Sequence, residues 1–340
     1  MLAKRARHLT RLYEMFYNAT ELVNTGKQYQ RMSDDERLTF REDANPKSLR
    51  LLELHDKLVE LEPSLFEKLC RTGPHAHAAS RHASACLANG QSNGRSEDMR
   101  KVREALPHMQ VWDPPLGDKS TRGLAHRTTA YYLSDPNLDF NNEQDVLQFM
   151  AYHNPPMTAS VWPRFLWFEG KHDPDRMSIG LLRGELLILT ARAILLSPSS
   201  AHRSPSAGAI QASGARGNRR RGPIGLAKTY QLTAVTPAFI AYVAVVTRHA
   251  LTSDDIFSEV CNGFHYVEFY GQLRVFLESS RFKHWTTELI NYWNEHVFEG
   301  ITFGQVNGMP QDRANGTLAQ LEAQAEVSRN ADPGSLSDDE

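Results

Sequence analysis

Two cysteines and three histidines lie within a span of seventeen residues near the start of the chain. They are Cys70, His75, His77, His82 and Cys86. Structural zinc needs four nitrogen or sulfur ligands in a tetrahedron, and such sites usually contain a close pair such as C-x₂-C. No close pair of this kind occurs here, and alanine and serine fill the space between. We therefore predict no metal ligand. The sequence by itself does not decide whether residues 70–86 bind a metal.

Other residues with chemical potential also lack a complete motif. Two carboxylates follow an imidazole in His172-Asp173-Pro174-Asp175, but the proline indicates a solvated turn. Gly217 and Gly222 have the spacing of a phosphate-binding loop, yet Pro223 occupies the place of its lysine. The G-x-S-x-G, G-x-G-x-x-G and H-E-x-x-H motifs do not occur. The sequence therefore predicts no catalytic residue, no cofactor-binding residue and no cofactor.

A basic segment gives the clearest functional signal. It contains Arg216, Arg219, Arg220 and Arg221, separated by glycine, alanine and asparagine. Arginine forks match phosphate oxygens, and counterion release favours such contacts. Because no aromatic residue alternates with these arginines, we expect any nucleic-acid binding to use phosphate contacts without sequence specificity. A nuclear import signal and a solvated loop without a partner remain the alternatives.

Charge and cysteine content limit the class of protein. The 340-residue chain has a formal charge of −2, but residues 186–253 contain eight cations and no acidic residue. Three widely spaced cysteines argue against a disulfide framework and favour a reducing compartment. The amino-terminal residues lack the apolar core of a secretory signal, and charges interrupt the best apolar run. We predict an intracellular protein, nuclear or cytoplasmic, without a membrane partner.

The amino-terminal part has helical periodicity. Apolar residues in 2–24 recur at spacings of three and four, which predicts one helix, with Gly26 after its end. Ser33 to Glu36 fits a capping box, and Asn45-Pro46 opens a further helix. We assign amphipathic helices to residues 1–46.

Most of the core is expected in the second half of a helical domain over 47–300. An aromatic segment with Trp162 and Trp167 leads into an apolar run that ends at Ser197-Pro198. Thr236-Pro237 starts a buried helix, and Ser253 precedes a further helical segment over 254–261.

Two low-complexity stretches interrupt this domain. We predict flexible insertions over 72–96 and 197–225, and a mostly disordered tail over 301–340. The predicted fold class is mainly α: an irregular helical domain with these two insertions and this tail.

Several blocks together resemble a known family. They are Leu49-Arg50-Leu51-Leu52, Arg122-Gly123, Trp162 to Leu166, Gly180 to Leu187, Ser197 to Ala201, Val235 to Val243, and Tyr292-Trp293-Asn294. In this order they resemble a domain family of unknown function that is expanded in mushroom-forming basidiomycete fungi, over roughly 47–298. The resemblance implies a fungal, mainly helical domain without an assigned activity, so it carries over no catalytic residue.

Three functions follow from these observations. The first is a non-catalytic interaction or scaffold protein with an unidentified protein partner. The second is a nucleic-acid-associated protein, related to chromatin or a mobile element, that uses the arginine segment. The third is an enzyme of a class whose signature the sequence does not display.

Overall fold

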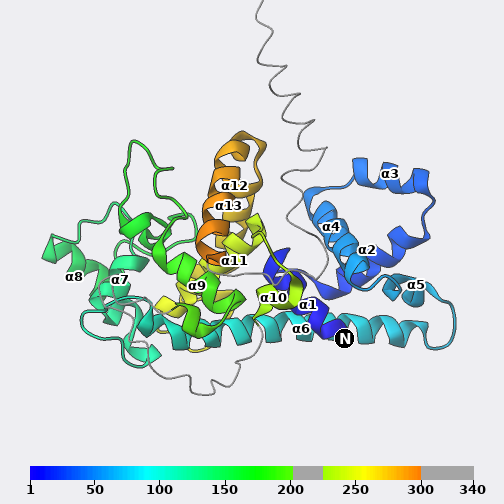
Figure 1. Ribbon diagram of the computed structural model, residues 1–340, viewed down its shortest axis with the longest axis horizontal. Coiled ribbons are helices and arrows are strands. Elements are labelled where there is room, and N and C mark those ends of the chain that lie inside the picture. Colours follow the sequence, from blue (N-terminus) through cyan, green and yellow to red (C-terminus); the bar gives the residue numbers. More distant parts are fainter. Residues whose placement is uncertain (202–224, 300–340) are drawn as a thin grey trace, which may run out of the picture. The chain divides into compact units, whose positions relative to one another are not determined.

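The computed structural model describes residues 1–201 and 225–299, and it confirms the mainly α fold class (Figure 1). The α-helices are α1 (Leu2–Leu12), α2 (Ala19–Arg31), α3 (Asp34–Glu42), α4 (Pro46–Leu61), α5 (Leu65–Cys70), α6 (Ala76–Ala105), α7 (Arg127–Leu133), α8 (Glu143–Tyr152), α9 (Glu185–Leu195), α10 (Leu226–Tyr230), α11 (Pro237–Leu251), α12 (Tyr266–Glu278) and α13 (Lys283–Phe298). Short 3-10 helices are η1 (Leu106–His108), η2 (Lys119–Thr121), η3 (Gly123–Ala125), η4 (Arg164–Leu166), η5 (Phe168–Gly170), η6 (Pro198–Ala201) and η7 (Ser280–Phe282).

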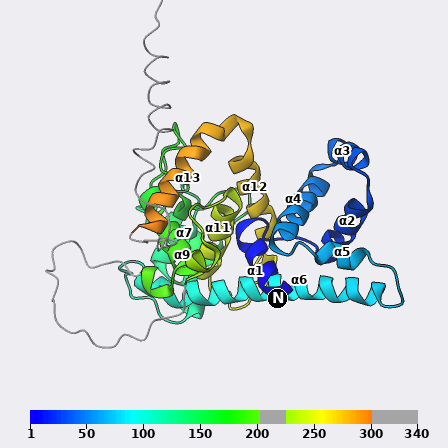
Figure 2. The ribbon, with the colours of Figure 1, turned by 45° about the vertical axis from the view of Figure 1, so that its right-hand side comes forward.

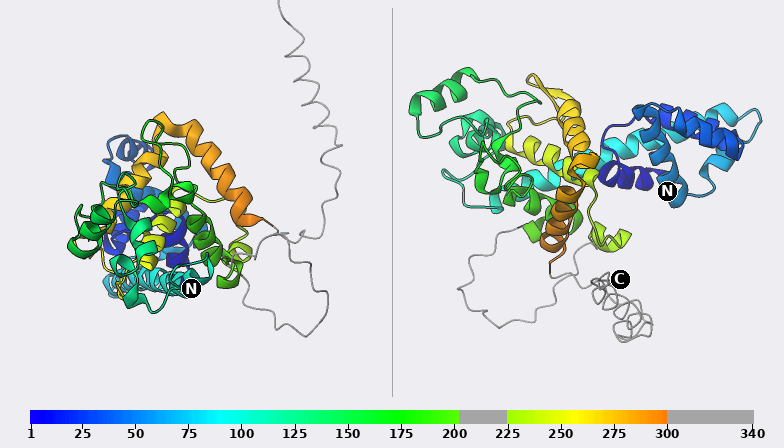
Figure 3. Two further views of the ribbon diagram at one scale, coloured as in Figure 1. Left: turned by 90° about the vertical axis from the view of Figure 1, so that its left-hand side faces the viewer. Right: turned by 90° about the horizontal axis from the view of Figure 1, so that it is seen from above.

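Helix α6 is the element against which the others are arranged. Helices α2 to α5 lie toward its amino-terminal end, and α7 to α9 lie toward its carboxyl-terminal end (Figures 1 and 3). Helix α1 packs along the middle of α6 and makes the most extensive contact between two elements. Residues 1–299 form one compact unit.

The prediction of a flexible insertion over 72–96 is wrong for residues 76–96, which belong to α6. The buried positions between residues 76 and 98 do recur every three or four residues, but apart from Leu87 they carry small or polar side chains: Ser80, Ala83, Gly90, Gln91, Gly94 and Asp98. A side chain at Gly90 would place its Cβ 2.5 Å from the carbonyl oxygen of Ala3. Glycine therefore lets α1 approach closely, and this packing stabilises a helix whose composition suggests a linker.

Two further local predictions are wrong. The helix expected over 2–24 is interrupted after Leu12, because Asn18 starts a new helix by accepting hydrogen bonds from the amides of Thr20 and Glu21. Gly26 lies inside α2, where a Cβ would be 2.2 Å from the ring of Phe66. The loop over 13–18 that results carries Glu14 into the junction described below.

The segment over 254–261 is not a helix. It leads into the antiparallel strands β1 (Val260–Cys261) and β2 (Phe264–His265). Asn262 and Gly263 connect them with φ angles of 48° and 80°. Two consecutive residues with positive φ form the tight turn of a two-residue hairpin, for which Asn-Gly is the preferred pair. Asn262-Gly263 is therefore a hairpin signal, and it lies directly after the segment 254–261 that was predicted to be helical.

Helix α11 forms the centre of the core. Every residue from Ala238 to Leu251 is buried, and the helix packs against α6, α9 and α12 (Figure 2). Thr236 caps it through a 3.0 Å hydrogen bond from the amide of Phe239. Helices α9 and α13 also meet, and the indole of Trp293 donates to the carbonyl of Leu182 at 2.8 Å. The tryptophan-bearing segment and the carboxyl-terminal helices therefore share one core.

Candidate functional site

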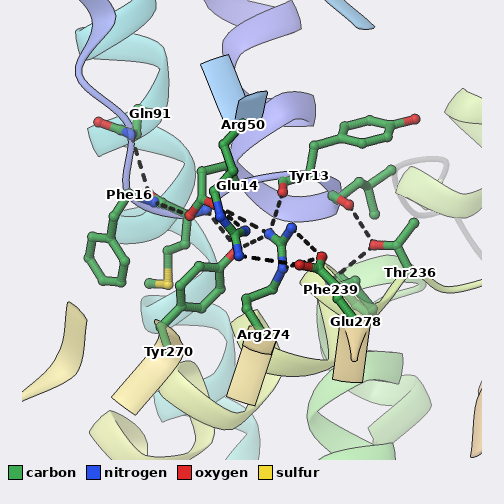
Figure 4. A network of polar contacts seen from close by, with 12 residues as sticks. Tyr13, Glu14, Phe16, Arg50, Gln91, Thr236, Phe239, Tyr270, Arg274 and Glu278 are labelled. Atoms are coloured by element: carbon green, nitrogen blue, oxygen red, sulfur yellow. Dashed lines mark hydrogen bonds and ion pairs between the residues drawn. The ribbon is translucent and has the colours of Figure 1, made fainter. Parts of the chain in front are cut away.

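The site begins where the loop over 13–18 meets α4 and α12. Arg50 lies on α4, Arg274 and Glu278 lie on α12, and Glu14 comes from the loop (Figure 4). We call these four charged residues the junction network. They come from three separate parts of the chain, and all of them belong to the unit formed by residues 1–299.

The junction network pairs its charges internally. Arg50 contacts Glu14 and Glu278, each at 3.3 Å. Arg274 donates to Glu14 at 3.3 Å and to Glu278 at 2.6 Å, and it also donates to the backbone carbonyl of Tyr13 at 2.6 Å. Two guanidinium groups therefore satisfy two carboxylates across the junction. Such charge-assisted pairs give geometric specificity to the contact between helices.

Burial sets the protonation behaviour of this network. Burial raises the pKa of Glu14 above its ordinary value, although Arg274 lowers it in part. Burial alone would lower the pKa of Arg274, but Tyr270, Glu278 and Glu14 together raise it above its usual range. Tyr270 is fully buried, and its hydroxyl accepts from the amide of Met15 at 3.1 Å. Arg274 therefore stays charged and holds the loop against α12.

Two open cavities border the junction network. One has a volume of about 340 Å³, and the other has a volume of about 590 Å³. Both are lined by Glu14, Arg50 and Leu54, and we call them the junction cavities. Val267 of α12 contributes to the wall of the larger one. Because Glu14, Arg50, Arg274 and Glu278 pair with one another, these four charges hold the shape of the surface between the two cavities.

Helix α12 and the region before it carry exposed apolar side chains, one of which, Val267, lines the larger junction cavity. Val267 and Val275 are exposed by 41% and 66% on α12, and the preceding hairpin region exposes Ile256 and Val260 by 83% and 48%. Val267 and Val275 are eight residues apart, so they lie on one face of the helix. We call Ile256, Val260, Val267 and Val275 the α12 patch. Clustered exposed apolar residues of this kind are typical of interaction surfaces.

The structure separates the cysteines and histidines of the candidate metal cluster. Cys70 ends α5 and contacts the carbonyl of Lys27 at 3.6 Å, whereas His82 and Cys86 face each other at 3.5 Å on one turn of α6. Within residues 1–201 and 225–299, no group of three or more His, Cys, Asp or Glu side chains could hold a metal ion. All three cysteines, which lie in these ranges, are free thiols.

The remaining predicted residues give no site. Asp173 pairs with Arg176 at 2.9 Å in an exposed turn, and His172 packs edge-on against Trp167. The nucleic-acid candidates Arg216, Arg219, Arg220 and Arg221 lie outside the described residues, together with most of 197–225 and the tail over 301–340. Residues 198–201, which belong to the predicted insertion, form η6 shortly after the end of α9 at Leu195.

Sequence reasoning missed the junction network. Its members are separated by up to 264 positions, and arginine and glutamate are common on exposed helix faces. One signal was present: Arg274 lies between Leu273 and Val275 in an apolar helix, so a charge there requires a partner. Only the fold supplies that partner.

The described residues define a mainly α-helical protein with an internally paired charged junction. Residues 89–298 match a family of unknown function (DUF6698), and the chain belongs to this family. No curated protein and no solved structure matches the chain. The expected resemblance to a family of unknown function is confirmed, but the match begins at residue 89 rather than near 47. Helix α12 thus lies inside the matched residues, whereas α1 to α5 precede them.

Within the described ranges, none of the helices has both the length and the apolar character that crossing a membrane requires.

Proposed function

We propose that the protein is a non-catalytic interaction or scaffold protein whose α12 patch contacts an apolar surface of a partner protein. The observation that carries this proposal is the exposure of Val267 and Val275 on one face of α12, where Val267 lines a cavity whose central charges are already paired. An apolar stripe on one helix face, bordered by charges, is the usual surface for docking a partner helix or groove. We place the protein inside the cell, in the nucleus or the cytoplasm.

Substitution of Val275 by Glu tests this function. The variant keeps the paired junction but places a charge in the apolar stripe, so desolvation of the carboxylate opposes docking. Leu147→Glu on α8 is the matched control, because Leu147 is 60% exposed and lies on a different helix. A partner that co-purifies with the wild-type protein is isolated. Its dissociation constant is then measured with the wild-type protein, with Val275→Glu and with Leu147→Glu.

We expect Val275→Glu to weaken the purified partner's binding at least tenfold and Leu147→Glu to leave it unchanged. Equal binding by wild-type protein and Val275→Glu contradicts the proposal. Equal loss in both variants also contradicts it, since this result shows a general effect of added charge.

A second function is supported by the arginine run in the sequence. Arg216, Arg219, Arg220 and Arg221 occur in a stretch without acidic residues, and such a run suits non-specific contacts with nucleic-acid phosphates. Replacement of Arg219, Arg220 and Arg221 by alanine should abolish retention of duplex DNA at 50 mM salt. Retention that is insensitive to salt and to these substitutions would remove this candidate. A chromatin or mobile-element role, and the family's expansion in basidiomycete fungi, stay predictions.

A further inference from the structure

Another cavity, of about 530 Å³, lies within the family-matched residues. Its wall combines apolar and cationic side chains from four segments, among them Arg122, Met157, Arg248 and Phe264. Arg122 precedes η3, Met157 follows α8, Arg248 lies on α11 and Phe264 lies on β2. Polar and apolar side chains share this wall, and a volume of several hundred Å³ is typical of small-molecule sites.

Arg248 is the central polar group of this wall. It is only 2% exposed, and its guanidinium carbon lies 3.2 Å from the centroid of the Phe264 ring. One terminal nitrogen donates to the hydroxyl of Tyr266 at 2.9 Å, and the other has only the thioether of Met157 at 4.0 Å. No carboxylate among residues 1–201 and 225–299 forms an ion pair with it. A guanidinium carries five N–H donors, so these two contacts leave donors for a further acceptor.

Arg122 adds a second buried cation to the same wall. It is 4% exposed and donates to the backbone carbonyls of Ala250 and Arg103, at 3.1 and 3.2 Å. In the part of the chain that the structure describes, it has no carboxylate within ion-pair distance either. The acidic residue found in the described wall is Asp254, and its carboxylate accepts from the side-chain amide of Asn262 at 2.5 Å.

Two other buried arginines, which do contact carboxylates, have pKa shifts of the opposite direction. Arg11 and Arg274 each contact carboxylates, and these partners raise the pKa of each above its usual value although burial opposes the shift. Burial instead lowers the pKa of Arg122 and of Arg248. Asp254 raises the pKa of Arg248 and Asp118 raises that of Arg122, but neither effect offsets burial and neither carboxylate forms an ion pair with the arginine. A buried charge without an ion-pair partner is costly, so an anion from outside the chain would stabilise this wall.

We propose that this cavity binds a small organic carboxylate with an apolar chain, with the carboxylate on the guanidinium edge of Arg248 and the chain against Met157 and Phe264. Phe264 covers one face of the guanidinium, so the planar edge is the part that engages a ligand, and this edge matches two carboxylate oxygens. Asp254 in the same wall repels a doubly charged phosphate more strongly than a singly charged carboxylate. The proposal is independent of the partner surface on α12.

The test uses the full chain and three probes, with binding measured by titration calorimetry. The probes are sodium octanoate, octan-1-ol, which has the same chain without the charge, and inorganic phosphate, which has charge without a chain. We expect saturable binding of one octanoate per chain, no comparable binding of the other two, and at least a tenfold loss of octanoate affinity in Arg248→Met.

A second pair of variants keeps Arg248 in place. Ala125 is exposed at the rim of the cavity, so Ala125→Trp should obstruct entry and weaken octanoate binding, whereas Ala151→Trp on the exposed face of α8 should not. If Arg248→Met fails to fold, Ala125→Trp and Ala151→Trp still test whether octanoate binds in this cavity. Octanoate binding that is absent, equalled by octan-1-ol or phosphate, or unchanged in Ala125→Trp overturns the proposal.

Discussion

The hydroxyl of Tyr242 on α11 donates a 2.9 Å hydrogen bond to the carboxylate of Asp98 on α6. Asp98 and Tyr242 are both fully buried, and the same carboxylate accepts two bonds from Arg11 on α1, at 2.5 and 2.9 Å. One carboxylate thus connects three helices. Because α1 precedes the family-matched residues, this contact joins the amino-terminal helices to the matched domain.

Loss of the Asp98 carboxylate should strongly destabilise the protein. Asp98→Leu removes both hydrogen bonds between Arg11 and Asp98 and leaves the buried guanidinium only the longer contact with Glu97 at 3.4 Å. Breaking a buried ion pair in this way typically costs about 3–5 kcal/mol in the free energy of unfolding. Urea denaturation measures the change. The double variant Arg11→Met, Asp98→Leu should recover most of the loss, and the exposed control Glu104→Gln should change stability by less than about 0.5 kcal/mol. A double variant as unstable as Asp98→Leu contradicts the interpretation.

Acidification should destabilise the protein through two buried histidines. Burial, with nearby cations, lowers the pKa of His249 to about 3 and of His8 to about 4, from an ordinary value of 6.5. Below pH 6.5 the unfolded chain takes up protons at these positions and the folded protein does not. The stability that these neutral histidines allow is therefore fully present above pH 6.5. It is lost as the pH falls, toward 4 for His8 and toward 3 for His249, at up to about 1.4 kcal/mol per pH unit for each histidine.

His249→Gln isolates this effect, since glutamine does not titrate. The free energy of unfolding of each protein is measured in urea at pH 7 and pH 5. The difference between the two pH values should be smaller in His249→Gln than in the wild-type protein, and contributions from other groups cancel in the comparison. Equal differences in the two proteins would refute the assignment.

Two glycines in helices should respond in opposite directions to alanine. Gly90→Ala places a Cβ 2.5 Å from Ala6, so we expect a loss of about 1–3 kcal/mol as α1 moves away from α6. Gly271 of α12 has no atom within 4 Å of the added Cβ, so Gly271→Ala should gain about 0.5–1 kcal/mol from the reduced freedom of the unfolded chain. Thermal unfolding compares them, and shifts of the same sign contradict the packing argument.

A fragment limited to residues 89–298 should not fold like residues 1–299. It lacks α1, begins inside α6 and leaves the buried Asp98 carboxylate without Arg11. We expect a broad thermal transition by circular dichroism and weaker hydrogen-exchange protection in α11 than in the longer protein. A cooperative transition at the same temperature in both would show that the amino-terminal helices are dispensable for the core.

Sequence reasoning succeeded where short-range hydrogen bonds specify structure. The capping box of Ser33 and Glu36 and the starts of α4 and α11 occur where they were expected. A cap requires only residues within one turn of each other, so its signature is complete in a short window. The wrong assignment of 76–96 has the opposite origin. Small residues acquire helical structure there from contact with α1, which no local window contains.

The candidate sites depend on still longer distances. Glu14 meets Arg274 only after the chain has closed a loop of 260 residues, and Arg248 becomes a buried charge without an ion-pair partner only when Phe264 covers it. Neither contact follows from a regular spacing of residues along the chain, so periodicity in the sequence could not predict it. The helical class, the caps and the tryptophan-bearing core are properties of local pattern and apolar content, and the sequence by itself determined them. The close contact of α1 with α6, the paired junction and the arginine-lined cavity were decided by tertiary packing, because burial and charge pairing arise only when distant segments exclude water together.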